Sequence, residues 1–260
     1  MMYPRVIPVL LIDQNKLIQT RKFKYLKYLG DPLNAIRIFN EKEVDELAFF
    51  DITATVNKSE PNYSLIKNMS RESRMPLCYG GGVKNLFQFE KIINLGVEKI
   101  SISSSAFLNN KLIIEASKIY GSQSVIATLD IKKHDEKYFI FIENGKKKIE
   151  AKIEDVIKKI QEDGVGEIIF NLIDRDGTRS GYDLEFIYSI KNLIKTPISL
   201  LGGANSYQDL ESVLKNFGLV GLCAGSMFSL KGKFNSVLLQ YLSKNEKNKL
   251  AEVLIKKYEL

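Results

Sequence analysis

Short apolar runs bounded by polar residues alternate along the chain with longer segments in which apolar residues recur at helical spacing. Such runs predict buried strands, and we expect strands at residues 5–11, 46–51, 76–80, 98–103, 124–130, 167–172, 197–201 and 219–224. Helical patterns lie between most of them, at residues 31–42, 60–71, 86–95, 109–120, 153–163, 183–194 and 206–216. This alternation predicts right-handed strand–helix–strand units and a parallel sheet.

Units of this kind fill a chain of 260 residues, which is close to the ~250 residues of a closed (β/α)₈ barrel, the TIM-barrel fold. Two smaller domains are the alternative, but no stretch rich in Pro, Gly or Ser divides the chain. We therefore predict an α/β fold in which residues 1–260 form a single (β/α)₈ barrel.

An internal repeat supports the barrel. Residues 76–107 align with residues 197–228 without a gap, at an offset of 121, and residues 6–11 align with residues 125–130 at an offset of 119. A fixed period of this kind is the signature of a repeated structural unit. The sequence thus predicts a two-fold barrel made of two half-barrels.

Two segments stand outside the repeated pattern. Residues 14–31 are basic and contain several aromatic residues; we expect a long loop after the first strand that acts as a mobile lid at the catalytic face. Residues 137–151 alternate apolar and polar positions around Asn144-Gly145. That pattern predicts a β-hairpin with a type I′ turn, inserted after the fifth strand.

The chain carries a net charge of +7, which favours anionic ligands or partners. Its basic residues are scattered, apart from a cluster at residues 146–148. A solvated, lysine-rich surface accounts for this distribution. Because we find no recognition motif or basic helix of the kind that reads nucleic acid, we predict no nucleic-acid partner.

Several features favour a cytoplasmic protein. The N-terminus lacks both the basic region and the small-residue cleavage site of a signal peptide, and no apolar run approaches the ~18 residues of a membrane span. Cys78 and Cys223 lie inside apolar runs. Buried free thiols in a reducing compartment are the favoured interpretation, and a disulfide is the alternative. We expect no membrane partner.

The polar, glycine-containing loop at residues 173–183 follows the strand expected at residues 167–172. Loops at the carboxyl ends of parallel strands carry the chemistry of (β/α)₈ barrels. Asp176 lies in this loop, and Asp130 ends the fifth strand. Either carboxylate can act as a general acid or base if its pKa is tuned, and holding the loops together is the alternative role.

Glycines and serines end the third, fourth, seventh and eighth strands. Glycine lets the backbone approach a phosphate closely, and N–H groups at a helix start point at it, although these glycines could simply form tight turns. We predict two opposed anion sites, which suit a ligand with phosphate at both ends. The phosphate- or substrate-binding residues predicted are Gly81, Gly82, Ser104, Gly177, Thr178, Gly202, Gly203, Gly225 and Ser226.

Charged residues begin four strands at the opposite end of the barrel. They are Arg5, Glu46, Lys99 and Glu167. Two positive and two negative side chains would form a ring there. An ion-paired plug that closes the barrel is one interpretation; because exposed pairs contribute little to stability, a functional role is the other.

These motifs closely resemble those of HisF, the cyclase subunit of imidazole glycerol phosphate synthase. The resemblance covers almost the whole chain and rests on DELAFFDIT, YGGGV, EKISIS, the strand that ends at Asp130, and, most specifically, IDRDGTRSGYD. It implies a two-fold barrel that pairs, at its N-terminal face, with a glutaminase (HisH-like) subunit whose ammonia crosses the barrel to the active site.

The family's functional positions carry over unevenly. The resemblance implies an ammonia gate at Arg5, Glu46, Lys99 and Glu167, phosphate binding at Gly82, Ser104, Gly203, Gly225 and Ser226, and the second catalytic aspartate at Asp130. The first catalytic aspartate falls at Leu11, which cannot transfer a proton. The repeat also places Leu11 opposite Asp130, and Asp13, two residues later with the same strand parity, is the nearest substitute. The lid lysine falls at Gln19, and polar strand positions appear as Asn171 and Leu201.

The combination resembles divergent HisF-like proteins associated with surface-polysaccharide genes. It implies a barrel that accepts glutaminase-derived ammonia and conducts it towards a sugar amidotransferase that amidinates an N-acetyl sugar in lipopolysaccharide or O-antigen synthesis, with a phosphorylated small molecule as ligand. One alternative is an authentic cyclase that converts PRFAR and ammonia to imidazole glycerol phosphate and AICAR in histidine biosynthesis. Another is a non-catalytic scaffold that activates the glutaminase. We predict neither a metal site nor a cofactor.

Overall fold

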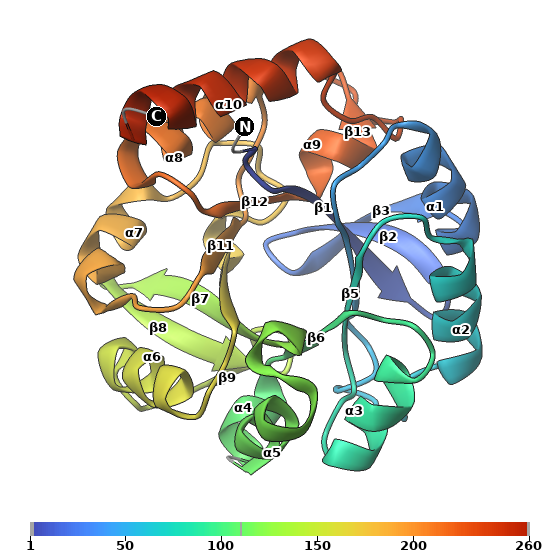
Figure 1. The fold of residues 1–260 in the computed structure, drawn as a ribbon, viewed down its shortest axis with the longest axis vertical. Helices are drawn as coiled ribbons and strands as arrows, with labels where there is room; N and C mark the ends of the chain where they lie inside the picture. Colours follow the sequence, from blue (N-terminus) through green and yellow to red (C-terminus); the bar gives the residue numbers. More distant parts are fainter. Residues whose placement is uncertain (1–2, 110, 259–260) are drawn as a thin grey trace.

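The computed structural model describes residues 3–109 and 111–258, and its centre is a closed barrel of parallel strands (Figure 1). The eight barrel strands follow one another around the barrel as β1 (Val6–Asp13), β4 (Leu47–Asp51), β5 (Leu77–Gly80), β6 (Lys99–Ile102), β7 (Val125–His134), β10 (Glu167–Leu172), β11 (Ile198–Leu201) and β12 (Gly221–Ala224). Parallel pairing of β12 with β1 closes the barrel. The predicted (β/α)₈ fold class is confirmed, and each predicted strand lies at its expected place.

Helices surround the barrel on the outside, as Figure 1 shows. They are α1 (Pro32–Glu41), α2 (Tyr63–Glu72), α3 (Leu86–Ile93), α5 (Lys111–Tyr120), α6 (Ile153–Glu162), α7 (Leu184–Ile190), α8 (Tyr207–Phe217) and α10 (Lys244–Tyr258). Local signals fix several helix starts. Asp31 accepts a hydrogen bond from the N–H of Asn34 ahead of Pro32 in the first turn of α1, and Ser206 with Asp209 forms a capping box on α8. Sequence patterns did not identify α10 or the short helices α4 (Ser104–Leu108) and α9 (Ser226–Ser229).

Alternating side chains on the strands divide the core in two. Outward-facing residues such as Val6, Leu10 and Ile12 pack against the helices. Inward-facing residues fill the barrel, because successive strand side chains point to opposite faces. The buried interior group consists of Ile7, Val9, Ala48, Cys78, Ile126, Ile169, Leu201 and Cys223. The barrel is therefore packed with small and aliphatic side chains along its axis, and both cysteines are free and buried there.

The segment predicted as a lid loop is instead a β-hairpin. Strand β2 (Lys16–Arg21) pairs antiparallel with β1, and β3 (Lys24–Gly30) pairs with β2. In the other half, β8 (Lys137–Ile142) pairs antiparallel with β7, and β9 (Lys147–Lys148) pairs with β8. The hairpin expected around Asn144-Gly145 is present as β8–β9, but a second hairpin, β7–β8, precedes it.

These two insertions are the same element repeated in each half-barrel. Their turns contain left-handed residues at Gln14-Asn15 and Lys22-Phe23 in the first half. The second half has them at Asp135-Glu136 and Glu143-Asn144. Each turn is displaced from its counterpart by 121 residues, the offset of the sequence repeat. The two-fold repeat thus extends to segments whose side chains no longer resemble one another.

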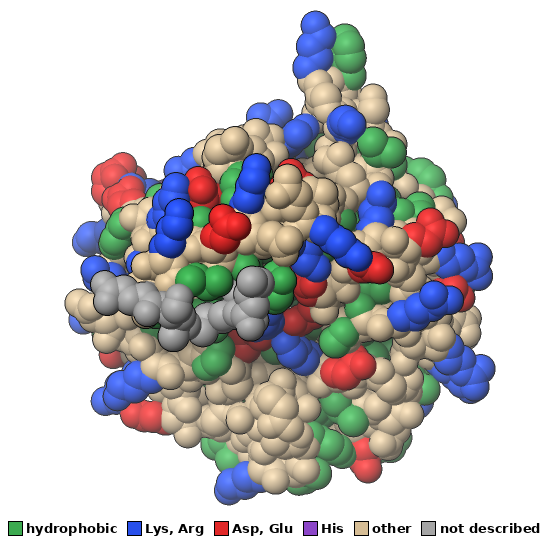
Figure 2. All heavy atoms as spheres, turned by 45° about the horizontal axis from the view of Figure 1, so that its top comes forward, with side chains coloured by type: hydrophobic (Ala, Val, Ile, Leu, Met, Phe, Trp, Pro, Cys, Tyr) green, Lys and Arg blue, Asp and Glu red, His purple; other side chains and the backbone are tan. Residues whose placement is uncertain are grey.

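Charges are mixed over the face seen in Figure 2, where basic and acidic side chains lie among each other. No helix within residues 3–109 and 111–258 is both long and apolar enough to cross a membrane.

Candidate functional site

A pocket opens at the carboxyl ends of the barrel strands, and every barrel strand or the loop after it contributes to its wall. It brings together predicted site residues that are far apart in the sequence: Gly81, Gly82, Ser104, Asp130, Asp176, Gly177, Gly202, Gly203, Gly225 and Ser226. Thr178 is the exception and lies outside the pocket lining. Its hydroxyl donates to the carbonyl oxygen of Arg175 at 2.8 Å, so Thr178 stabilises the loop, and ligand binding by this residue stays a prediction.

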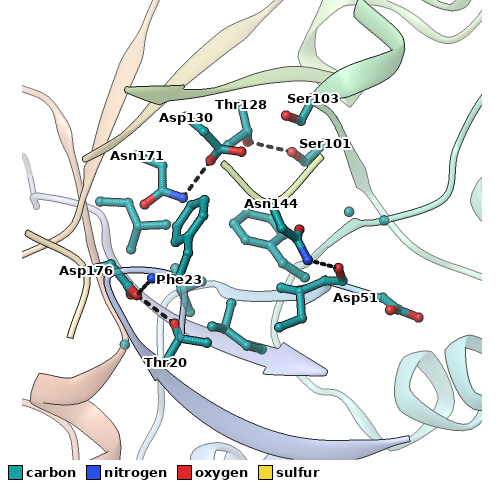
Figure 3. A pocket seen from close by; sticks show the side chains of 18 of the residues that line it. Thr20, Phe23, Asp51, Ser101, Ser103, Thr128, Asp130, Asn144, Asn171 and Asp176 are labelled. Carbon is teal, nitrogen blue, oxygen red and sulfur yellow. Dashed lines mark hydrogen bonds between the residues drawn. The ribbon is translucent and has the colours of Figure 1, made fainter. Parts of the chain in front are cut away.

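Asp130 lines the pocket, where β7 pairs in register with β10 and places Asn171 beside it. The amide nitrogen of Asn171 donates to Oδ1 of Asp130 at 2.8 Å (Figure 3). Burial is the largest influence and raises the pKa of Asp130 to about 7, with the charge of Asp176 acting in the same direction and hydrogen bonds from Asn171 and Ser103 opposing it. At neutral pH this carboxyl can therefore both donate and accept a proton.

We expect Asp130→Asn to stabilise the fold in a pH-dependent way. In the unfolded chain the carboxyl titrates near its ordinary pKa of 3.8. Above the folded pKa both states are ionised and the folded state bears the full cost of the buried charge; below pH ~4 both are protonated and the cost vanishes. Urea unfolding should show a gain of roughly 2–4 kcal/mol at pH 8 that falls to less than half at pH 5. Asp135→Asn, on an exposed turn, is the control; an equal gain at both pH values would contradict the raised pKa.

Asp176 connects the loop after β10 to the first hairpin. Its Oδ2 accepts hydrogen bonds from the hydroxyl of Thr20 at 2.7 Å and from the N–H of Phe23 at 3.0 Å. Burial raises the pKa of Asp176, while these two hydrogen bonds lower it. Gly177 makes the approach possible, because a Cβ at this position would lie 2.1 Å from the carbonyl oxygen of Thr20. The anchoring role that the sequence left open for Asp176 is thus present in the structure.

The turns of the two hairpins meet over the pocket. Phe23 at the β2–β3 turn lies against Gly145 at the β8–β9 turn, where an added Cβ would be 3.3 Å from the Phe23 ring. Asn144, beside Gly145, donates to the carbonyl oxygen of Ile52 at 2.5 Å. Figure 3 shows both Phe23 and Asn144 among the side chains that line the pocket. The sequence pattern predicted the β8–β9 turn but gave no sign that this turn would line the pocket.

The two halves of the pocket differ in polarity. On one side Asp130 pairs in register with Asn171; at the equivalent place in the first half, Leu11 pairs with Phe50. Asp13, the candidate substitute for the missing aspartate, is not part of the pocket lining and ends β1 opposite Lys16. The position equivalent to Asp130 is therefore apolar and lacks a carboxylate, although Asp51, Glu143 and Asp176 also line the pocket.

The predicted anion sites depend on the backbone. None of the described residues that line the pocket is a lysine or an arginine. Gln19 occupies the position beside Gly225, with its amide nitrogen donating to the carbonyl oxygen of Thr20 at 2.9 Å and its oxygen accepting from the hydroxyl of Ser229 at 3.1 Å. At the opposite side of the pocket, the hydroxyl oxygen of Ser104 accepts a hydrogen bond from the N–H of Glu143 at 3.3 Å. Any phosphate would thus be held by N–H and hydroxyl groups rather than by cations.

The four charged residues at strand starts form the expected ring at the opposite end of the barrel. Arg5 bridges Glu46 at 2.8 Å and Glu167 at 3.0 Å, and Lys99 bridges the same two carboxylates at 2.9 and 3.5 Å. Ser199 donates a further hydrogen bond to Glu167. Burial opposes ionisation of Arg5, but Glu167 and Glu46 raise its pKa above the ordinary value. The ring has no net charge and closes the interior from below.

Polar groups between ring and pocket are few. Ser101 and Thr128 share a hydrogen bond of 2.6 Å and lie below Asp130, on the inward-facing positions of β6 and β7. Strand parity relative to Asp130 could have identified Thr128, since residues two apart share one face. The interior between ring and pocket is therefore filled mainly by apolar side chains.

Comparisons with known proteins agree with one another. Residues 5–235 match a family model described as histidine biosynthesis protein. The chain is 48% identical, over 96% of its length and 99% of the relative's, to a Leptospira borgpetersenii protein provisionally named imidazole glycerol phosphate synthase subunit HisF. It is 46% identical, over 97% and 98%, to a Vibrio vulnificus protein provisionally named imidazole glycerol phosphate synthase subunit hisF3. Identity to the imidazole glycerol phosphate synthase subunit HisF of Clostridium botulinum is 32%, over 94% and 97%.

Proposed function

The chain belongs to the HisF family of imidazole glycerol phosphate synthase subunits, and from this premise we propose that it conducts ammonia for a glutamine amidotransferase whose acceptor lies beyond the barrel. The family's cyclisation uses two carboxylates at the barrel mouth. Here the mouth pairs Asp130 with Asn171 on one side and Leu11 with Phe50 on the other. The proposal rests on one observation: the mouth lacks one of the two carboxylates, whereas the charged ring at the opposite end of the barrel is complete.

The ring suits the entry of ammonia. Two cations and two carboxylates neutralise one another in a closed set of ion pairs, so a glutaminase subunit docked on this face could displace one arm without leaving a large net charge. Arg5 is the most accessible arm, with 36% of its side chain exposed, whereas each glutamate is 7% exposed. Ammonia is small and neutral, and the aliphatic interior above the ring admits it more readily than it admits ions or water.

The finer assignment concerns the acceptor. Asp130 can transfer a proton in the pocket, but the position of the family's first catalytic aspartate is occupied by Leu11, so the paired carboxylates of the family's ring closure are incomplete. We propose that ammonia passes on to a sugar amidotransferase that amidinates an N-acetyl sugar in surface-polysaccharide synthesis. The backbone N–H groups at Gly82, Gly203 and Gly225 would hold a phosphorylated ligand that signals readiness to the glutaminase.

A three-component assay tests the proposal. The chain, its glutaminase and the amidotransferase are mixed with the N-acetyl sugar, and amidine formation is followed with glutamine or with an ammonium salt. We expect glutamine-dependent product only when all three proteins are present, and faster than with the equivalent concentration of free ammonium. Equal rates from both nitrogen sources would show that no channelling occurs.

Authentic cyclase activity is the second candidate, favoured by the retained Asp130, Asp176 and glycine-ended strands. Complementation of a strain that lacks its cyclase subunit distinguishes the two: growth without histidine would contradict the conduit proposal. A non-catalytic scaffold that only activates the glutaminase would give faster glutamine hydrolysis in the assay above but no channelled product.

A further inference from the structure

Two hairpins beside the pocket mouth form a basic surface without a single acidic residue. We call residues 21–28 (RKFKYLKY) and 231–238 (KGKFNSVL) the mouth surface. The second segment contains the short strands β13 (Leu230–Lys231) and β14 (Ser236–Val237), and Lys27 joins the segments by donating to the carbonyl oxygen of Asn235 at 2.8 Å. The mouth surface thus spans two elements that are about 200 residues apart in sequence.

The cations of the mouth surface are unpaired. Arg21, Lys22, Lys24, Lys27, Lys231 and Lys233 form no ion pair with any described carboxylate. Some basic side chains elsewhere are paired, as Lys159 is with Asp163 and Lys215 with Glu211, but what sets the mouth surface apart is six cations in sixteen residues with no acidic residue among them. The mouth surface therefore offers a concentrated positive charge to an external anionic group.

Large apolar side chains lie between these cations. Phe234 at the tip of the second segment is 80% exposed, and Tyr25 and Tyr28 are 64% and 52% exposed. Contiguous exposed apolar groups rimmed by charge mark interaction sites, and aromatic residues are enriched at protein interfaces.

Strand β3 adds a third feature, an open sheet edge. Its only strand partner among the described residues is β2, and its residues Lys24, Tyr25, Leu26 and Tyr28 are exposed. The outward backbone groups of such an edge need hydrogen-bond partners if they are covered. A lipid bilayer or a nucleic acid supplies no matching ladder of N–H and C=O groups, whereas a strand of another protein does.

We propose that the mouth surface docks a partner protein that presents an acidic, extended segment to the edge of β3. Thr20 and Phe23 of the same hairpin line the pocket, so a protein bound here would cover the mouth. Identifying this partner as the enzyme that consumes ammonia rests on the proposed function: an acceptor that covers the mouth takes up ammonia before it is lost to solvent. The hairpin then serves both as pocket cover and as docking strand.

Photocrosslinking identifies the partner in cells that express the full chain. p-Benzoylphenylalanine replaces Tyr25 on the mouth surface or, as a control, Tyr188 on α7, which is 45% exposed. The captured protein is then purified and its affinity measured for the wild type, for Lys24→Glu/Lys231→Glu/Lys233→Glu, and for the matched control Lys67→Glu/Lys118→Glu/Lys195→Glu, whose three lysines are exposed elsewhere.

We expect a protein to be crosslinked at position 25, through an acidic peptide, but not at position 188. The triple substitution Lys24→Glu/Lys231→Glu/Lys233→Glu, here called the mouth reversal, should raise the Kd of this protein about 10–100-fold. The control triple substitution should leave the Kd unchanged. Binding should also weaken with salt and slow hydrogen exchange in residues 24–30. Equal affinity for both triple variants would overturn the proposal. The proposal would also be overturned if no protein were crosslinked and the mouth surface instead bound phosphatidylglycerol vesicles or single-stranded DNA.

The two proposals fail separately in this design. If the captured protein binds the mouth surface but makes no use of ammonia, the docking site stands and the ammonia assignment fails. If glutamine-driven amidination proceeds at the wild-type rate with the mouth reversal, the function stands and the docking site fails.

Discussion

Leu11→Asp is expected to raise cyclase turnover by about 10²–10⁴-fold, the usual contribution of a positioned general acid or base. The substitution restores a carboxyl at the position equivalent to Asp130 in the other half-barrel, and Leu11 already borders the pocket, so the new side chain can reach water and ligand. The measurement is imidazole glycerol phosphate formation from the cyclase substrate, with an ammonium salt as nitrogen source. A second carboxylate also raises the pKa of its neighbour, so the activity should fall at both pH extremes.

Leu11→Asn is the matched control, because asparagine is nearly as large and as polar as aspartate but cannot transfer a proton. Adding Asp130→Asn to Leu11→Asp should abolish the gain. If Leu11→Asp stays inactive while its melting temperature matches the wild type, the barrier lies elsewhere, with Gln19 and Leu201 as the next positions to change.

Glu46→Gln is expected to have the largest effect at the other end of the barrel. Glu46 pairs with both Arg5 and Lys99, and its loss leaves two cations to share Glu167. Removing one partner of a buried pair commonly costs about 3–5 kcal/mol; because Arg5 remains partly exposed and can turn to water, we expect a loss of about 2–3 kcal/mol in urea unfolding. In the assembled enzyme, glutamine-driven turnover should fall more than turnover with an ammonium salt.

Glu72→Gln provides the comparison. Glu72 pairs with Arg37 on the outer surface, where both side chains are substantially exposed, and the change should cost no more than about 0.5 kcal/mol. A cost at Glu46 as small as that at Glu72 would mean that solvent, not the ring, satisfies these charges.

Much of the fold could be predicted because barrel strands carry strong local signals. Buried runs such as residues 167–172 and the gapless repeat define the half-barrels, and the ring follows from charged residues at strand starts. The hairpins were harder. The β2–β3 turn is formed by Lys22-Phe23, with left-handed φ angles of 51° and 61°, and neither residue signals such a turn.

Within the pocket, sequence reasoning identified the residues at strand ends but not those that reach them from elsewhere. Asp130, Gly82 and Gly203 follow directly from strand position. Asn144 and Phe23 enter from hairpin turns, and their place depends on how two insertions fold back over the barrel, which no local pattern encodes. Thr178 belongs to the most distinctive motif but lies outside the pocket lining, where its hydroxyl bonds within the loop, and its binding role stays a prediction.

The apolar pair Leu11–Phe50 also has a genetic consequence. No codon for leucine becomes a codon for aspartate by a single base change; at least two are needed, by way of a residue such as valine or histidine. A population that carries this gene therefore cannot regain the missing carboxylate in one mutational step. Return of the carboxylate would therefore pass through a chain with another residue, such as valine or histidine, at position 11.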